Sequence, residues 1–257
     1  MKIIFYILSI YPLKLAFYMC DVVLKVLPLG ILRTLTPFKV TRKNLSIAFP
    51  NLSSQELDSF AKASYLETIK SFYETLYTWS RSSTKIIYHT KKINNRFLFN
   101  TNAKKDGLII FALHNRSIDF LLRWISSQRA HTSLYKKIKL KPIDRFVKKL
   151  REEGDCKMVE TGIGGVKSIL NSLMNNQMTC MASDQVPANG LGTYSTFFGH
   201  ECYSFALAPK LARKSKKQIL MSYLSYEKDI GHVINFVAVS YTHLRAHETS
   251  LHLVCRL

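Results

Sequence analysis

The fold is decided by Gly107-Leu-Ile-Ile-Phe-Ala-Leu113, which runs without a break into His114-Asn-Arg-Ser-Ile-Asp119. Seven uncharged, mostly apolar residues predict a strand that is covered on both faces, as in the sheets of α/β proteins. Residues 117–129 then predict a helix that begins shortly after the strand ends. In such folds, binding and catalytic residues gather where strands end and loops begin. We therefore expect a functional site directly after this strand.

Strands and helices alternate along the chain beyond this point. The hydrophobic pattern predicts strands over 131–135, 155–159, 178–182, 219–224 and 232–239, and helices over 142–153, 166–173 and 205–212. Upstream, Ser53-x-x-Glu56 is a capping box that opens a long amphipathic helix. The alternation predicts an α/β fold, a three-layer sandwich in which helices flank a mixed, largely parallel sheet.

The amino-terminal end of the chain is strongly apolar over its first 32 residues. Three charged side chains interrupt this stretch, namely Lys14, Asp21 and Lys25. We expect residues 1–35 to form an N-terminal membrane-anchoring helix, either tilted across the bilayer or lying in its interface. The alternative is an ordinary buried helix that is kinked at Pro12.

The remainder divides into a domain and a tail. Residues 36–239 contain no internal repeat and no low-complexity linker, so we expect one catalytic domain there. From Ser240 onward the sequence has neither strand nor helix periodicity and resembles translated sequencing adapter. We expect residues 240–257 to be a non-native tail on a domain that is truncated at its carboxyl end. For this reason the three histidines of the tail are not interpreted as metal ligands.

The composition limits the class of partner. The chain has 37 Lys and Arg against 17 Asp and Glu, a formal net charge of +20, which indicates a polyanionic partner such as nucleic acid, anionic lipid or a phosphorylated substrate. The five cysteines are scattered and form no C-x-x-C motif, so we expect neither disulfides nor a zinc site. No Walker loop or dinucleotide-binding motif is present, and we predict no nucleotide and no metal.

His114 and Asp119 are the first candidates for chemistry. A histidine at the end of a strand can act as a general base when a carboxylate bonds one imidazole nitrogen and fixes the tautomer. Asp119 can reach the ring if His114 lies in the turn before the helix. Because these motifs include no serine or cysteine nucleophile, we expect the substrate's own hydroxyl to be the nucleophile. Arg116, backbone N–H groups at the start of the helix, or Arg151 could stabilise the developing negative charge.

Other features strengthen this interpretation. Eight basic residues and one acid lie between Lys136 and Arg151, and five basic residues lie between Lys210 and Lys217. Asp184 and Gln185 follow another predicted strand and lead into a glycine-bearing loop. Their position places them with His114, at the carboxyl ends of strands.

Motifs in the same order along the chain resemble those of the bacterial lipid A biosynthesis acyltransferases, and they cover nearly everything from residue 1 to about 239. The matching pieces are Asn44-Leu45 with Phe49-Pro50, the H-x4-D pair His114 and Asp119, Arg151 with Gly154, Asp184-Gln185 with Phe197-Phe198-Gly199, and Ala208–Arg213. The residues between His114 and Asp119 depart from the usual pattern, and Asp replaces the commoner Glu. We expect these departures to affect the acceptor and the chain length more than the reaction.

The resemblance implies an O-acyltransferase that takes a fatty acyl chain from an acyl-carrier-protein thioester and needs no cofactor. The implied acceptor is a hydroxyl of a phosphorylated glycolipid, the lipid A precursor, at the cytoplasmic face of the bacterial inner membrane. It implies a catalytic His114–Asp119 dyad. Arg116, Arg151, Asp184 and Gln185 are then expected to bind substrate or support the dyad, although an ion pair between Arg151 and Asp184 that only bridges two loops is the alternative.

Two other functions remain open from sequence alone. The first is acylation of a lysophospholipid or a glycolipid by the same two residues. The second is a non-enzymatic nucleic-acid-binding protein, which only the charge suggests. Because no RNA- or DNA-binding module is visible and the basic residues lack interleaved aromatics, we expect membrane lipids and the carrier protein, and no nucleic acid, as partners.

Overall fold

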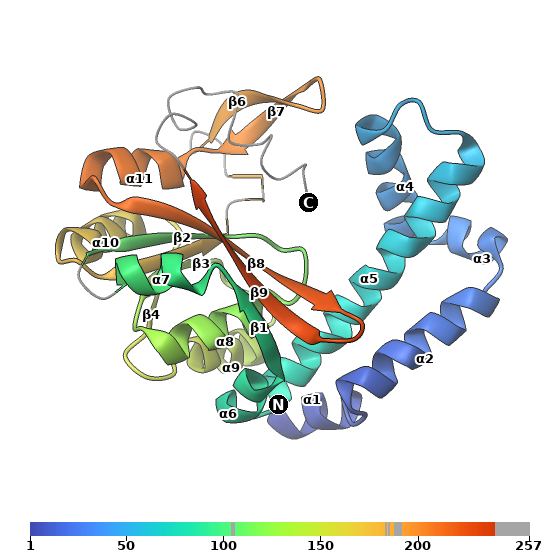
Figure 1. The fold of residues 1–257 in the computed structure, drawn as a ribbon, viewed down its shortest axis with the longest axis horizontal. Helices are drawn as coiled ribbons and strands as arrows, with labels where there is room; N and C mark the ends of the chain where they lie inside the picture. The colour runs from blue at the N-terminus through green and yellow to red at the C-terminus, as the bar shows by residue number, and fades with distance from the viewer. Residues whose placement is uncertain (104–105, 183, 185, 188–191, 240–257) are drawn as a thin grey trace. The chain divides into compact units, whose positions relative to one another are not determined.

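The computed structural model describes residues 1–257 apart from 104–105, 183, 185, 188–191 and 240–257 (Figure 1). The chain forms two compact units, Lys2–Ser80 and the part from Arg81 onward. The first unit includes the segment that was expected to be an anchor, together with the long capped helix. The expected tail and Gln185 lie outside the described residues.

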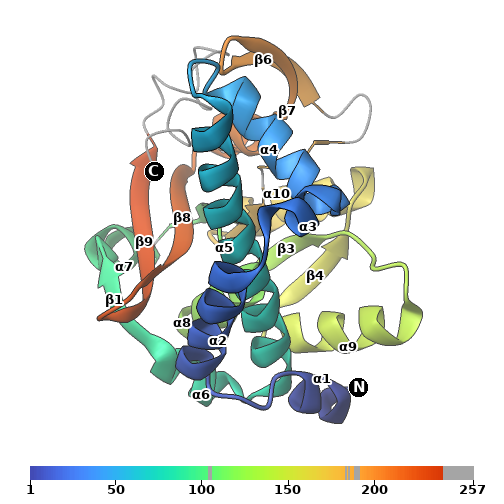
Figure 2. The same ribbon diagram turned by 90° about the vertical axis from the view of Figure 1, so that its right-hand side faces the viewer.

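The first unit is helical. Its helices are α1 (Lys2–Leu8), α2 (Leu13–Val26), α3 (Leu29–Thr34), α4 (Thr36–Ala48) and α5 (Ser54–Ser80). The capping box is confirmed at the start of α5, because Ser53 N–H donates to Glu56 Oε2 (2.8 Å) and Glu56 N–H donates to Ser53 Oγ (3.3 Å). Figure 2 shows α2 and α4 lying along α5.

The apolar N-terminal segment is two helices with a break before Pro12. Among the described residues, no single helix is long and apolar enough to cross a bilayer; α1 and α2 pass that test only together, and they are bent by 51°. One side of this pair is buried, at Phe5, Leu13 and Phe17. A membrane-anchoring helix therefore stays a prediction.

The second unit is the α/β part. Its described helices are α6 (Ser83–His89), α7 (Arg96–Ala103), α8 (Ile118–Gln128), α9 (Lys141–Arg151), α10 (Ile163–Met174) and α11 (Leu207–Ser215). Its described strands are β1 (Thr90–Asn94), β2 (Leu108–Ala112), β3 (Thr132–Tyr135), β4 (Lys157–Glu160), β5 (Met178–Ala182), β6 (Gly192–Phe197), β7 (His200–Phe205), β8 (Gln218–Glu227) and β9 (Gly231–Val239).

The central sheet is mixed and largely parallel, as predicted. Its order is β1-β9-β8-β2-β5, and only the β8–β9 pair is antiparallel. The short parallel pair β3–β4 continues from β5 through a bridge between His131 and Met178. β6 and β7 form a separate antiparallel hairpin whose turn is Phe198-Gly199, both with positive φ.

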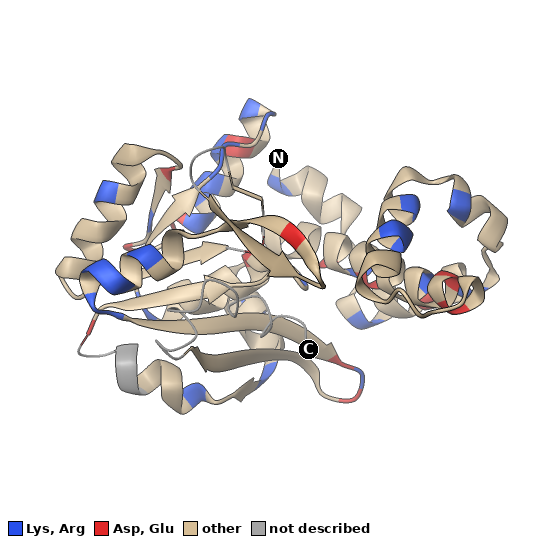
Figure 3. Cartoon of the chain, turned by 90° about the horizontal axis from the view of Figure 1, so that it is seen from above, with Lys and Arg blue, Asp and Glu red and all other residues tan. Residues whose placement is uncertain are grey.

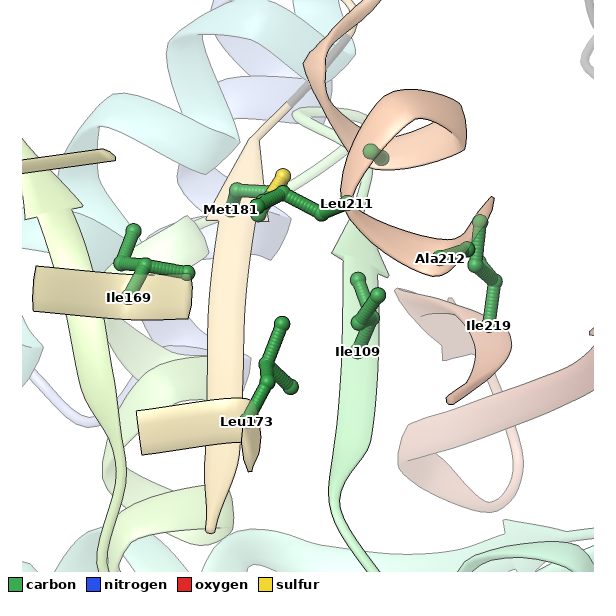
Figure 4. Packing of buried hydrophobic residues seen from close by; sticks show 8 residues of the cluster. Ile109, Ile169, Leu173, Met181, Leu211, Ala212 and Ile219 are labelled. Atoms are coloured by element: carbon green, nitrogen blue, oxygen red, sulfur yellow. The ribbon is translucent and has the colours of Figure 1, made fainter. Parts of the chain in front are cut away.

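Helices cover both faces of the sheet and complete the three layers. Figure 4 shows one face, where α10 and α11 pack on the strands through Ile169, Leu173 and Leu211 against Ile109 and Met181. On the other face, rings from α7 and α8 pack against β9; these are Phe99, Trp124 and Phe236. β2 is buried because β5 and β8 flank it in the sheet and helices cover both faces of the sheet.

Candidate active site

His114 lies at the carboxyl end of β2, where the continuous apolar run ends. The strand lies between β5 and β8, parallel to both. Carboxyl ends of parallel strands meet at one edge of a sheet, so the residues after β2 and β5 come together. Asp184, which follows β5, therefore reaches His114. The sequence pattern predicted that both residues follow strands. It did not predict that they contact each other.

Asp184 holds His114 by two hydrogen bonds. The imidazole Nδ1 is 2.7 Å from Asp184 Oδ1, and the backbone N–H of His114 donates to Oδ2 at 2.6 Å. Partial burial raises the pKa of Asp184, and the hydrogen bonds from His114 lower it. The lowering outweighs the raising, so the pKa of Asp184 lies below its usual value. An ionised carboxylate can only accept, so Nδ1 carries the proton of this hydrogen bond.

This arrangement suits general-base chemistry. With Nδ1 protonated and held, Nε2 is the nitrogen of the neutral ring that can take up a proton. The His114 side chain is 33 % exposed, which leaves it reachable from solvent. The turn that carries it is tied to β8, because Asn115 Nδ2 donates to the carbonyl of Leu224 (2.6 Å).

Asp119, which is buried, and Arg151, which is partly buried, form an ion pair beside this turn. Arg151 Nε lies 2.6 Å from Asp119 Oδ1, and Nη2 lies 3.1 Å from Oδ2, a two-pronged contact. Burial lowers the pKa of Arg151, but the charge and hydrogen bonds of Asp119 outweigh it and the net pKa is raised. Its guanidinium also lies 5.5 Å from the ring centroid of Tyr135. Arg151 thus forms its ion pair with Asp119, whereas the alternative considered from the sequence was an ion pair with Asp184. The pairing of Asp119 with His114 stays a prediction.

Asp119 owes its place to the start of α8. Ser117 is the N-cap residue and accepts a hydrogen bond from the backbone N–H of Phe120. Asp119 then falls in the first turn of the helix, where a negative charge is favourable. The H-x4-D spacing therefore places the histidine before the helix and the carboxylate inside it, as the sequence predicted.

Arg116 is buried rather than a surface side chain. Its residue is 7 % exposed, and its guanidinium lies 5.4 Å from the ring centroid of Tyr226 on β8. The Tyr226 ring also contacts His232, which in turn stacks on Phe120. This aromatic cluster fixes the helix and the β8–β9 hairpin on either side of Arg116. Sequence reasoning could not find it, because its members are far apart in the chain.

Basic side chains recur on α9 and on the loop before it. Figure 3 shows Lys and Arg spread over helices of the chain, with fewer acids. The exposed ones in this region are Lys136, Lys137, Lys139, Lys141, Arg145 and Lys149. Val147 on the opposite side of α9 is buried, so the helix presents a basic outer face. Arg151 at its end is the residue that contacts Asp119.

A separate pocket of about 760 Å³ lies at the amino ends of β3, β4 and β5. It is lined by His131 and mostly polar neighbours, and none of the predicted site residues that the structure describes borders it. Among the described residues, no three His, Cys, Asp or Glu side chains are grouped so that they could hold a metal ion.

The fold and the site together define a class: an α/β protein with a histidine–carboxylate contact at the carboxyl edge of its sheet. The family model of the bacterial lipid A biosynthesis acyltransferases matches residues 23–247, and the chain belongs to this family. The protein is therefore an acyltransferase of this kind. The match extends into the stretch from Ser240 that was expected to be a non-native tail. The search of curated individual proteins gives no match.

Proposed function

We propose that this acyltransferase moves a fatty acyl chain from an acyl-carrier-protein thioester to a hydroxyl of a lipid A precursor, with His114 as general base. The observation that carries the proposal is the 2.7 Å contact between His114 Nδ1 and Asp184 Oδ1. The family supports acyl transfer to a lipid of this class. The donor and acceptor follow from the motifs that the chain shares with it.

The reaction needs no cofactor. His114 Nε2 takes the proton from the acceptor hydroxyl as its oxygen attacks the thioester carbonyl carbon. The tetrahedral intermediate then collapses, the carbon–sulfur bond breaks, and the leaving thiolate takes the proton from His114. The products are an ester and a free thiol, and the histidine is neutral again. Asp184 stabilises the imidazolium while it exists.

Asp119 acts in this proposal through Arg151. Its carboxylate holds the guanidinium by two hydrogen bonds, so Arg151 is fixed beside the turn that carries His114. The proposal thereby adds Asp184 to the dyad expected from the sequence and gives the two carboxylates different tasks. Asp184 orients the base, and Asp119 positions a cation that balances negative charge near the site.

The oxyanion of the intermediate needs donors that are already in place. We assign this role to the first backbone N–H groups of α8 and to Arg116, which lies in the same turn as His114. Arg151 is the weaker candidate because two of its nitrogens are already bonded to Asp119.

We place the enzyme at the cytoplasmic face of the bacterial inner membrane, where a carrier-bound donor and a glycolipid acceptor meet. The exposed basic face of α9 and its preceding loop is the proposed surface for the acidic carrier protein or for lipid phosphates. We propose no metal and no nucleic-acid partner.

The test is an assay of the full chain in membranes with a labelled acyl-carrier-protein donor and two acceptors, a lipid A precursor and lysophosphatidic acid. We expect transfer to the lipid A precursor and loss of turnover in His114→Ala. His131→Asn serves as the matched control, because it removes a histidine at the other edge of the sheet. Acylation of lysophosphatidic acid alone would contradict the acceptor, and normal turnover in His114→Ala would contradict the mechanism.

A further inference from the structure

Tyr135 is a buried tyrosine that no step of the proposed reaction uses. It is the last residue of β3, it is 2 % exposed, and it pairs with Glu160 of β4. The hydroxyl of a buried tyrosine needs a hydrogen-bond partner, and its ring can in addition hold a cation. Both parts of Tyr135 contact α9, the helix that carries Arg151.

The hydroxyl of Tyr135 fixes the start of α9. It donates to Asp144 Oδ1 at 2.6 Å, and the backbone N–H of Ile138 donates to the same oxygen at 2.7 Å. The hydrogen bond from Tyr135 is the largest of the influences that hold the pKa of Asp144 below its usual value, so this carboxylate is ionised at neutral pH. Hydrogen bonds to a charged acceptor are about twice as strong as neutral ones. The contact therefore holds the first turn of α9, and the loop before it, against the end of β3.

The ring of Tyr135 lies against the residue at the other end of α9. The guanidinium carbon of Arg151 is 5.5 Å from the ring centroid, which is within the range of cation–π contacts. Two nitrogens of the same guanidinium donate to the carboxylate of Asp119, at 2.6 and 3.1 Å. A planar guanidinium can make both kinds of contact at once, along its edge and over its face. Arg151 is thus held from two directions.

The two groups that Tyr135 contacts lie on one side of α9. Asp144, the buried Val147 and Arg151 are spaced by three and four residues, which places them within roughly 60° around the helix axis. This side of the helix is therefore the one that packs toward the end of β3. Because a single side chain contacts the first turn and the last turn of α9, it fixes the rotation of the helix and, with it, the position of Arg151.

We propose that Tyr135 is a positioning residue for acyl transfer, whose ring and hydroxyl together hold Arg151 beside the turn that carries His114. This inference rests on the proposed function, in which Arg151 balances negative charge near the site. Tyr135 acts through Arg151, which donates to Asp119 next to that turn. Its loss is expected to displace the cation while Asp184 still holds the base.

The first measurement follows the guanidinium of Arg151 without any substrate. Nitrogen-15 NMR of the purified full chain gives the rate at which the Arg151 Nε–H exchanges with solvent, and the signal is assigned by its loss in Arg151→Gln. We expect exchange at least about tenfold faster in Tyr135→Leu, because the aromatic face is gone. Tyr135→Phe keeps the ring and should stay within about threefold of the wild type. Unchanged exchange in Tyr135→Leu would overturn the proposal.

The second measurement separates positioning from general packing. Tyr135→Leu should lower kcat about tenfold and leave KM for the acceptor within about twofold, since an interaction made only in the transition state is weakened. In Arg151→Gln, whose amide can still donate to Asp119, the same substitution should lower kcat by less than about twofold, because no guanidinium remains to be positioned. Equal factors in the two backgrounds would mean that Tyr135 supports the fold alone and would contradict the proposal.

Phe99→Leu is the matched control, because it removes a ring from the other core of the same unit. Phe99 is 2 % exposed and stacks on Phe236. We expect its urea midpoint to fall as that of Tyr135→Leu does, with kcat and the exchange of Arg151 unchanged. A loss of kcat as large as that in Tyr135→Leu would rule out a special role for Tyr135. The exchange measurement needs no acyl donor, so a wild-type chain that shows the expected exchange but no acyl transfer would contradict the proposed function and leave the placement of Arg151 by Tyr135 intact.

Discussion

The two histidines at opposite edges of the sheet show how environment separates a reactive group from a structural one. His114 follows β2, is one-third exposed, and meets the carboxylate of Asp184 at Nδ1. His131 precedes β3, is 2 % exposed, and has serine hydroxyls at both nitrogens, Ser133 at 2.7 Å and Ser126 at 3.0 Å.

The difference lies in what each ring can do with a proton. Burial lowers the pKa of His131 to about 4, and no charge in its hydrogen-bonded surroundings offsets this, so the ring is neutral at physiological pH. The ionised partner of His114 stabilises an imidazolium, which a general base must become. A polar pocket lies next to His131, yet only the edge with His114 has the charge arrangement that proton transfer requires.

The largest effect is expected when the contact between His114 and Asp184 is broken. Asp184→Asn keeps the size of the side chain but removes its charge and allows the wrong imidazole tautomer. We expect kcat to fall by about 10²–10⁴, the range for general bases and their orienting carboxylates. The measurement is turnover of acyl donor under saturating acceptor. The control is Asp155→Asn, the same change in an exposed residue at the pocket edge, and equal kcat values in the two variants would contradict the comparison.

The next largest effect is expected at the ion pair between Arg151 and Asp119, which lies beside the turn that carries His114. Arg151→Ala leaves the buried Asp119 carboxylate without its cation, and we expect the free energy of unfolding to fall by about 3–5 kcal/mol. Urea denaturation measures this. Asp119→Ala/Arg151→Ala should recover part of the loss because no uncompensated charge remains. Arg145→Ala, on the exposed face of the same helix, should change little; a loss in Arg145→Ala as large as that in Arg151→Ala would argue against the ion pair.

Acidification should lower the free energy of unfolding through the buried His131. Because the folded-state pKa of His131 is about 4 and the unfolded value is near 6.5, the unfolded chain binds more protons between these values. The contribution of His131 to the free energy of unfolding is therefore fully present above about pH 6.5 and is lost as the pH drops toward 4. The loss is about 2 kcal/mol at pH 5. Urea midpoints at pH 7.5 and 5 measure the effect. His89, whose pKa is also lowered to about 4, adds a loss of the same sign, so His89→Gln provides the background in which His131→Gln is compared.

The smallest effect is that of a single hydroxyl at His131. Ser126→Ala removes the partner of Nε2 and should lower the free energy of unfolding by about 1 kcal/mol, with kcat unchanged. Thermal and urea unfolding measure the first quantity, and the acyl-transfer assay measures the second. A fall in kcat comparable to that of Asp184→Asn would mean that the two edges are not functionally distinct.

Much of the fold was predictable because its signals are local. The apolar run before His114, the capping box at Ser53, and Pro142 at the start of α9 each act within a few residues, and the structure confirms the elements they predict. The short strand β1 and the β6–β7 hairpin were not predicted. β1 has little apolar content, and its pairing with β9 joins residues about 140 positions apart.

The site was predictable in its residues but not in its partnerships. Ends of strands pointed to His114 and Asp184, and the H-x4-D spacing pointed to Asp119. The contact of Asp184 with the imidazole depends on the strand order, since β5 is the neighbour of β2. The sequence gives the order along the chain, whereas the order in the sheet follows from packing against helices on both faces.

The most direct test of the central claim is the imidazole tautomer of His114. Nitrogen-15 NMR of the full chain, at a pH where the ring is neutral and with signals assigned by comparison with His114→Gln, distinguishes the two ring nitrogens. We predict a protonated Nδ1 and an unprotonated Nε2 in the wild type, with this preference lost in Asp184→Asn. A protonated Nε2 in the wild-type protein would contradict the account, because that nitrogen could not then accept the proton of the acceptor hydroxyl.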